Sequence, residues 1–467
     1  MRLDRFIIFL LLFSLLTSGC HSSYDTATIS PTISPISVKT PSKTSMALLL
    51  STPHPTSPPV IPYPNLFTIT PSVSFSKEHG DSFSPSISAN GQWVAFISRA
   101  NDLIEKPLSQ CRSLNGQFEY CANVFVYDHD NGTINLVSIS NDGTPANGNS
   151  GDPQISADGN WIVYTSEATN LIRGKTNSDR AIYVFNRKTG NTELVQAPGR
   201  KATISGDGRY IAFESSGSIF IYDHQTGETK LVGGELNFGQ PGGDSLSPEI
   251  SVDGQWLAFW SWDGNLVPGD KEVCALGDVS HSCGDVFLYN RETGTFTRIV
   301  VGAAYGLGMG EFQLSLSENG LWLAYNDRVF NRQTRRSEQL CGVGKIQCGG
   351  ILSSDGHKVA FWTGTNYFTY DRSTGKVNQA NIASDGKPGN GKYIDFTNSI
   401  EGESFTPGFS ISADGQWVAF ASTDSNLTAD DIDQCNAPRF PPHNCYNVFM
   451  HNQVTRQTYL ISKPSRK

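Results

Sequence analysis

One short phrase recurs seven times along this chain of 467 residues and restricts its fold more than any other feature. Each copy reads as a short alternating strand, an Asp-Gly or Asn-Gly pair, and a second strand of the type Trp-Val-Ala-Phe. Asn-Gly and Asp-Gly accept the positive φ angles of a type I′ turn, so each copy predicts a β-hairpin. The copies begin at Ser84, Asp152, Lys201, Ser247, Phe312, Gly349 and Pro407.

A second phrase follows every hairpin and predicts two further strands. It reads NVFVYDHDNGTINLV from Asn123 and IYVFNRKTGNTELVQ from Ile182, and further copies begin at Ile219, Asp285, Arg328, Tyr367 and Asn447. Each repeat therefore supplies four antiparallel strands. Four strands repeated seven times predict an all-β fold, a seven-bladed β-propeller of four-stranded antiparallel blades, because a closed ring buries both faces of every blade.

Both phrases resemble the TolB-type WD40-like propeller repeat, which occurs in many exported bacterial proteins. The resemblance recurs in every predicted blade, so it is specific for the fold. It implies little about activity, because propellers of this family include binding proteins and enzymes alike.

The N-terminal segment has the layout of a secretory signal, with Arg2 and Arg5 before an apolar run. Its end, Thr17-Ser18-Gly19-Cys20, resembles the lipobox of bacterial lipoproteins, in which Cys20 becomes the lipidated first residue. An ordinary secretory signal is the alternative. The sequence thus predicts a lipoprotein signal peptide, a disordered Ser/Thr/Pro-rich tether and a propeller, at residues 1–19, 20–65 and 66–467. The propeller would be exported and anchored by lipid to the cell membrane, or to an outer membrane, outside the cytoplasm.

The order of strands in a meander separates the two faces of the ring. The turns between strands 1 and 2 and between strands 3 and 4 lie on one face, and here they are short. The loops between strands 2 and 3 and the crossings between blades lie on the other, which we expect to carry any binding site. Its long segments are residues 98–122, 166–180, 233–246, 261–284, 383–406 and 422–446.

Eight of the nine cysteines lie in close pairs on this second face, and the ninth is Cys20. Closely spaced CxxC pairs, which a zinc site would favour, are absent. The short separations predict four local disulfides that stiffen loops. They are Cys111 with Cys121, Cys274 with Cys283, Cys341 with Cys348, and Cys435 with Cys445.

Several residues of this face are candidates for recognition. Four loops open with a similar phrase, such as SRANDL from Ser98, which is either a repeated ligand contact or an Asx turn with a Leu that fills the loop base. Clustered carboxylates at Asp430, Asp431 and Asp433 indicate either a calcium site or a solvated acidic loop, and no other cofactor is expected. Aromatic anchors for a partner are predicted at Trp262, Tyr305, Phe312 and Tyr393.

Catalytic signatures such as GxSxG, HExxH and the Walker loop are absent. The pairs Asp128-His129 and Asp223-His224 fall beside turns between strands 3 and 4, which indicates a turn role.

A net charge of -9 argues against nucleic acid as a partner. We therefore favour a monomeric module that binds or scaffolds an envelope protein or polysaccharide. A purely structural envelope component is another reading. The enzymatic alternative is a polysaccharide lyase, glycosidase or lactonase-like propeller with its site in the central channel, where Glu249 could face inward.

Overall fold

A computed structural model describes most of the chain from residue 80 onward. The described residues are 80–112, 118–175, 179–234, 244–270, 273–276, 279–282, 284–300, 313–340, 350–364, 366–391, 408–431, 434–435 and 443–463. For 273–276, 279–282, 300, 434–435 and 443 only the backbone is described. The predicted signal, Cys20 and the tether lie outside these residues.

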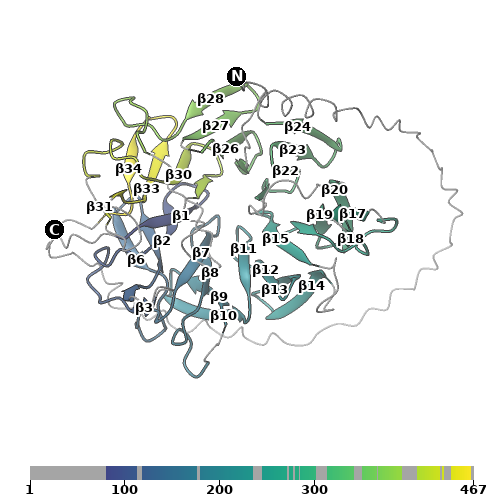
Figure 1. Cartoon of the computed structure of the whole chain (residues 1–467), viewed down its shortest axis with the longest axis horizontal. Coiled ribbons are helices and arrows are strands. Elements are labelled where there is room, and N and C mark those ends of the chain that lie inside the picture. The colour runs from purple at the N-terminus through teal and green to yellow at the C-terminus, as the bar shows by residue number, and fades with distance from the viewer. Residues whose placement is uncertain are drawn as a thin grey trace, which may run out of the picture. The chain divides into compact units, whose positions relative to one another are not determined.

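Seven four-stranded antiparallel sheets form the blades, and they follow one another around a ring in chain order (Figure 1). Blades 1 to 3 are β1 (Ser82–Ile87), β2 (Trp93–Ser98), β5 (Asn123–Asp128), β6 (Thr133–Leu136); β7 (Ser150–Ile155), β8 (Trp161–Ser166), β9 (Ala181–Asn186), β10 (Asn191–Gln196); and β11 (Arg200–Ile204), β12 (Tyr210–Ser215), β13 (Ser218–Asp223), β14 (Glu228–Gly233). Blades 4 and 5 are β15 (Ser245–Ile250), β16 (Trp256–Ser261), β19 (Asp285–Asn290), β20 (Thr295–Val300); and β21 (Leu314–Leu316), β22 (Trp322–Tyr325), β23 (Arg328–Asn331), β24 (Arg336–Gln339). Blades 6 and 7 are β25 (Gly350–Leu352), β26 (Lys358–Trp362), β27 (Tyr367–Asp371), β28 (Lys376–Gln379); and β29 (Phe409–Ile411), β30 (Trp417–Ser422), β33 (Asn447–Asn452), β34 (Thr458–Leu460).

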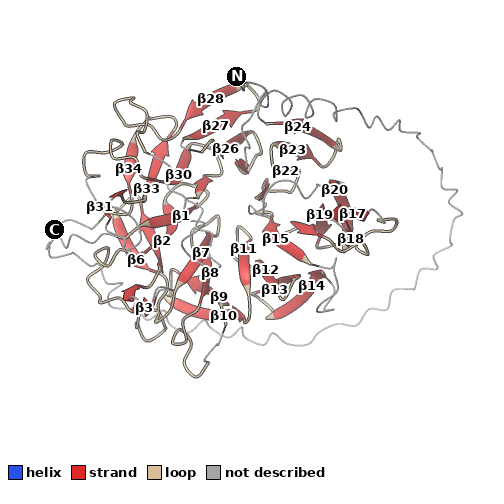
Figure 2. Ribbon diagram, viewed as in Figure 1, coloured by secondary structure: helices blue, strands red, loops and turns tan. Residues whose placement is uncertain are grey.

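The predicted seven-bladed β-propeller is therefore confirmed, and all regular structure among the described residues is strand (Figure 2). Consistently, this part of the chain contains no helix long and apolar enough to cross a membrane.

The ring closes by direct packing of blade 1 on blade 7, because blade 7 draws all four of its strands from the C-terminal end of the chain. The Ser82 amide donates to the carbonyl of Tyr446 at 2.7 Å. The Tyr446 amide donates in turn to Asp81 Oδ1 at 2.9 Å. Neither the first nor the last blade borrows a strand from the other.

The hydrophobic core is divided into seven clusters, and each lies between two neighbouring blades. Strand β2 is an example, because its successive side chains point alternately toward the two neighbouring blades. Val94 and Phe96 pack in the cluster shared with blade 7, whereas Ala95 packs in the cluster shared with blade 2. All three side chains are fully buried. Every blade thus depends on both neighbours for burial of its apolar surface.

The long insertions between second and third strands occur where the sequence predicts them, in blades 1, 2, 4 and 7. Three of them contain a small two-stranded hairpin of their own. These are β3 (Gln110–Arg112) with β4 (Phe118–Tyr120), β17 (Val273–Leu276) with β18 (Val279–Ser282), and β31 (Gln434–Cys435) with β32 (His443–Asn444). We call the side of the ring that carries them the loop face, and the opposite side the turn face.

Candidate binding site

On the turn face, the glycine of every inner hairpin turn packs against a large side chain of the preceding blade. Gly208 of blade 3 shows the fit, because its φ of +77° suits glycine and a Cβ added there would overlap the indole of Trp161. The same contact recurs around the whole ring. The pairs are Trp93 with Gly159, Trp161 with Gly208, Tyr210 with Gly254, Trp256 with Gly320, Trp322 with Gly356, Lys358 with Gly415, and Trp417 with Gly91.

An Arg or His side chain packs on the aromatic ring in six of these seven contacts. The Arg187 guanidinium lies 3.5 Å from the centre of the Trp93 ring. Its Nε donates to the carbonyl of Gly159 at 2.7 Å, so one side chain joins two blades. Equivalent residues are His129 on Trp417, His224 on Trp161, Arg291 on Tyr210, Arg332 on Trp256, and Arg372 on Trp322. His129 and His224 lie beside the turns between the third and fourth strands, as predicted, and their rings pack on the preceding blade.

Backbone hydrogen bonds form a third ring, closest to the channel, and link the inner turns of all seven blades. The amide donors and carbonyl acceptors are Ala89 to Ala157, Asp158 to Gly206, Gly206 to Val252, Asp253 to Glu318, Glu318 to Ser354, Ser354 to Ala413, and Ala413 to Ala89. Their lengths run from 2.8 to 3.4 Å. These backbone hydrogen bonds and the stacked side chains occupy the turn face with contacts that hold neighbouring blades together.

The repeated phrase at the start of the long loops also has a structural role. Ser98 Oγ accepts the amide of Ala100 at 3.0 Å, and Ser166, Ser261 and Ser422 accept equivalent amides. The leucines of the phrase are buried in three of the four loops: Leu103, Leu171 and Leu427. These contacts confirm the turn interpretation of the phrase, with the leucine filling the loop base.

The inserted hairpins share one cysteine pattern. In the first, Cys111 lies opposite Glu119, and it forms a disulfide with Cys121, two residues further on. In the other two, Cys274 lies opposite His281 and Cys435 lies opposite His443. Cys283 and Cys445 again follow two residues later, and Cys445 is disulfide-bonded. The structure thus contains the first predicted disulfide. Cys283 and the side chains of Cys274 and Cys435 lie outside what the structure describes, so the other two pairings stay predictions. Cys341 and Cys348 lie outside the described residues.

Of the aromatic anchors that the sequence predicts, only Trp262 is described. It is half-buried and packs against Gly284, so much of its surface serves the loop itself. Tyr305, Phe312 and Tyr393 lie outside the described residues. The most exposed large apolar side chain of the described loop face is Phe118, 69% exposed on strand β4. Its flanking residues carry no repeat pattern, so the sequence gives no signal for it.

The acidic cluster of blade 7 has internal partners for both of its described members. Asp430 pairs with Lys463 at 2.7 Å, and Asp431 is buried and accepts a hydrogen bond from Asn447 at 3.0 Å. Asp433 lies outside the described residues. Among the described residues, no group of three or more His, Cys, Asp or Glu side chains could hold a metal ion.

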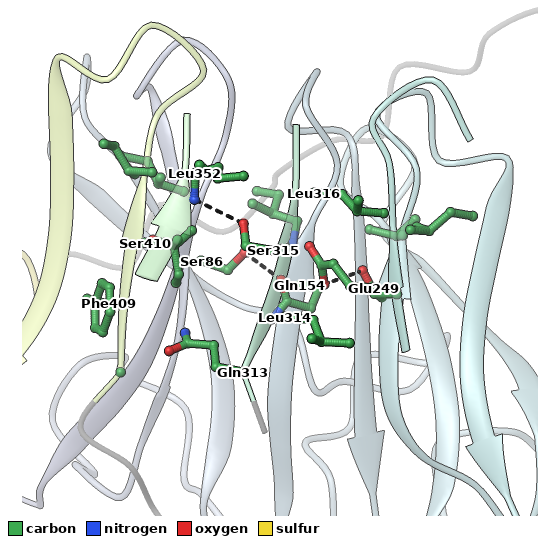
Figure 3. A pocket seen from close by; sticks show the side chains of 18 of the residues that line it. Ser86, Gln154, Glu249, Gln313, Leu314, Ser315, Leu316, Leu352, Phe409 and Ser410 are labelled. Atoms are coloured by element: carbon green, nitrogen blue, oxygen red, sulfur yellow. Dashed lines mark hydrogen bonds between the residues drawn. The ribbon is translucent and has the colours of Figure 1, made fainter. Parts of the chain in front are cut away.

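A cavity of about 480 Å³ lies along the axis of the ring, inside the innermost strands of the blades. A belt of side chains with one member per blade surrounds it, and Figure 3 shows several of them. The belt consists of Ser86, Gln154, Thr203, Glu249, Ser315, Ile351 and Ser410. Glu249, the one member of this belt that the sequence pattern predicts could face the channel, does line the cavity.

Four neighbouring innermost strands carry a bulge just before this belt. The register shifts in β1, β7, β11 and β15. In each bulge a residue other than glycine has a left-handed backbone, with φ between 49° and 54°: Ser84, Asp152, Lys201 and Ser247. All four line the cavity. Such strained positions persist only where the surroundings hold them, and they concentrate at functional sites.

A buried carboxylate supports one of these bulges from the neighbouring blade. Glu214 on β12 accepts the amide of Ser247 at 2.5 Å and pairs with Arg200 at 2.8 Å. Burial raises its pKa, although Arg200 and the hydrogen bond from the Ser247 amide oppose the shift. The proline that follows the strained residue in β1, β7 and β15 was the available sequence signal for the bulges, since edge strands tolerate proline.

Glu249 is the ionisable member of the belt. Its side chain faces the cavity while the ring encloses it, and Thr203 Oγ1 donates to its Oε2 at 3.4 Å. Desolvation raises the pKa of Glu249 to about 8, and the hydrogen bond from Thr203 offsets only part of the shift. At neutral pH the carboxyl group is therefore mainly protonated and offers a donor as well as an acceptor.

No protein-family model matches the sequence, and no curated protein matches it as a relative. Solved structures with a similar fold include an oligogalacturonate lyase in complex with manganese, at 13% identity over 74% of this chain and 86% of that one, with a TM-score of 0.46. TolB from Acinetobacter baumannii is 15% identical over 74% of this chain and 77% of its own, with a TM-score of 0.38. An oligogalacturonate lyase from Vibrio parahaemolyticus is 10% identical over 82% and 86%, with a TM-score of 0.41.

These similarities concern the fold alone. The observed order of strands makes this chain a seven-bladed β-propeller of four-stranded antiparallel blades.

Proposed function

We propose that this protein is an exported, lipid-anchored binding module that recognises a protein or glycan of the cell envelope through its loop face. The observation that carries the proposal is the unequal use of the two faces. The turn face is occupied by contacts between blades around the whole ring. The loop face carries inserted hairpins that the blades do not need for their own pairing.

The inserted hairpin of blade 1 is suited to recognition. Its disulfide limits the conformations of the free loop, which lowers the entropy lost on binding. Within the loop that the disulfide closes, Phe118 exposes its aromatic ring to solvent. Aromatic side chains dominate the binding energy of many interfaces. The same hairpin arrangement in blades 4 and 7 extends this surface.

Two features support a location outside the cytoplasm. The N-terminal segment has the pattern of a signal ending at a lipidated cysteine, Cys20. The Cys111–Cys121 disulfide is of a kind that persists in oxidising compartments. The Ser/Thr/Pro-rich residues 20–65 would then hold the propeller away from the membrane surface.

Partner binding is tested best with two substitutions of almost equal exposure on opposite faces. Phe118 on the loop face is 69% exposed, and Val454 beside a turn of blade 7 is 67% exposed. Envelope protein and polysaccharide fractions are passed over the immobilised chain, and bound material is quantified for each variant. We expect Phe118→Ser to weaken capture about tenfold and Val454→Ser to leave it unchanged.

Equal capture by wild type and Phe118→Ser, with loss in Val454→Ser, would contradict the assignment of the faces. The anchor is tested separately with Cys20→Ala, which should move the protein from the membrane fraction to the soluble one. Continued membrane association of that variant would refute the lipid anchor without affecting the choice of face.

A further inference from the structure

The axial cavity has two chemically different walls. Blades 1 to 5 contribute hydroxyl, amide and carboxyl groups through Ser86, Gln154, Thr203, Glu249 and Ser315. Blades 6 and 7 contribute Ile351 and the half-buried rings of Trp362 and Phe409, together with Ser354 and Ser410. Tyr367 also borders the cavity, but it is 3% exposed and its hydroxyl donates to the carbonyl of Ala421. Figure 3 shows Phe409 and Glu249 on opposite sides of the belt.

Several groups of the polar wall retain hydrogen-bonding capacity toward the cavity. The Gln154 side chain is exposed there, and its Oε1 accepts a long hydrogen bond of 3.5 Å from Ser86 Oγ. Glu249 uses Oε2 for the bond from Thr203. A polar ligand would satisfy groups that the protein leaves incompletely paired.

The charge of the cavity excludes strongly ionic ligands from its centre. Its described lining contains three acidic or basic residues: Asp152 and Lys201 at the bulges, and Glu249 in the belt. Since burial keeps Glu249 mainly protonated at neutral pH, the belt carries little net charge. An anion would meet no cation in the belt, and a cation would first require Glu249 to lose its proton.

We propose that the axial cavity binds a neutral, polyhydroxylated ligand, such as a sugar ring, between the polar wall at Glu249 and the aromatic wall of blades 6 and 7. The hydroxyl groups of a sugar match the neutral donors and acceptors of one wall. Its C–H faces match the aromatic rings of the other. The volume of about 480 Å³ lies within the range of small-molecule sites. This site is separate from the loop-face function and does not depend on it.

The test compares three probes that share one ring and differ in charge: glucose, glucuronate and glucosamine. Galactose and N-acetylglucosamine are included as further neutral probes. Binding to the full chain is measured at pH 7 by isothermal titration calorimetry and by saturation-transfer NMR. We expect at least one neutral sugar to bind saturably and about tenfold more tightly than both charged probes.

Two substitutions of Glu249 separate a neutral carboxyl from a carboxylate. Glu249→Gln keeps a neutral donor and acceptor and should retain affinity within about threefold, whereas Glu249→Leu should weaken binding at least about tenfold. Gln154→Leu provides a second test on a side chain already exposed to the cavity. Glu228→Leu and Gln416→Leu, both exposed and remote from the cavity, are the matched controls.

Three results would overturn the proposal. One is the absence of saturable binding for every neutral sugar at about 20 mM. Another is a preference for glucosamine that disappears in Glu249→Gln, which would show a carboxylate that binds a cation. The third is unchanged affinity in both Glu249→Leu and Gln154→Leu. None of these results depends on capture through Phe118, so the two functions can fail independently.

Discussion

The turn face and the loop face of this propeller are built from the same seven repeats, yet they differ in how strictly those repeats are kept. On the turn face, an inner-turn glycine meets a side chain of the preceding blade in all seven blades. On the loop face, blades 3, 5 and 6 have short connections while blades 1, 4 and 7 carry inserted hairpins.

This difference shows where the stability of the ring resides. A contact repeated between all neighbouring blades closes the ring, so losing one copy exposes surface on two blades. The strands of an inserted hairpin pair only with each other. In blade 1 its contact with the core between blades is limited to Tyr120, so loss of the hairpin should disturb that interface much less. Two predictions test this contrast and one tests the channel between the two faces, in order of the expected effect on stability.

The largest effect is expected at a turn-face glycine. Gly208 and Gly190 have similar φ angles, +77° and +74°, but an added Cβ overlaps Trp161 at Gly208 and meets open space at Gly190. Gly190→Ala should cost about 1 kcal/mol through backbone strain alone. Gly208→Ala should cost more than about 3 kcal/mol, because the indole of blade 2 must move as well. Chemical denaturation of both variants measures the difference, and equal losses would show that the contact between blades contributes nothing.

An intermediate effect is expected in the channel, where pH should change stability through Glu249. Its pKa is about 8 in the folded protein and about 4.5 when unfolded. Between these values the unfolded chain releases this proton while the folded chain keeps it, so the unfolding free energy contributed by Glu249 falls as pH rises. Relative to Glu249→Gln, the wild type should lose about 2 to 4 kcal/mol between pH 5 and pH 8.

The comparison with Glu249→Gln is needed because His451 acts in the opposite direction. Burial lowers the pKa of His451 to about 4, so its contribution to stability rises with pH between about 4 and 6.5. Both proteins contain His451, and its effect cancels in the difference. Parallel pH profiles of wild type and Glu249→Gln would mean that Glu249 is ionised in the folded state, and they would remove the basis for a neutral channel.

The smallest effect on the ring is expected from the disulfide of the loop face. Cys111 and Cys121 enclose a loop with a sequence separation of 10, for which the entropic model gives at most about 2.7 kcal/mol. Because the hairpin can open while the blades stay folded, the double variant Cys111→Ala/Cys121→Ala should lower the global stability by less than about 1 kcal/mol. Limited proteolysis should nevertheless become faster within the hairpin. A global loss above about 3 kcal/mol would show that the loop face also holds the ring together.

The fold was predictable because its signals are local and repeated. A turn pair such as Asp158-Gly159 together with an alternating strand defines a hairpin from a dozen residues, and seven copies leave few architectures. The same alternation placed the insertions of blades 1, 2, 4 and 7 between the second and third strands, which the structure confirms. The same alternation correctly placed His129 and His224 beside turns, but it did not indicate their packing on the preceding blade.

The contacts between blades were not predictable from these patterns. Trp93 and Gly159 belong to different repeats, and within its own repeat each residue already has a local explanation, as a strand aromatic or a turn glycine. The bulges in the innermost strands were missed because bulged and regular strands share one apolar pattern. Phe118 is a candidate because its side chain is exposed, and this exposure could not be predicted from the residues around it.

The sequence by itself determined the number of blades, the order of their strands and the face on which the insertions lie, because hairpin chemistry acts over a few neighbouring residues. Only the tertiary structure decided which side chains meet around the axis. The belt of Ser86, Gln154, Thr203 and Glu249 brings together residues that lie far apart in the chain, and its charge follows from their shared burial. These side chains become buried only when the seven blades close into a ring, so the sequence of a single repeat does not show their burial.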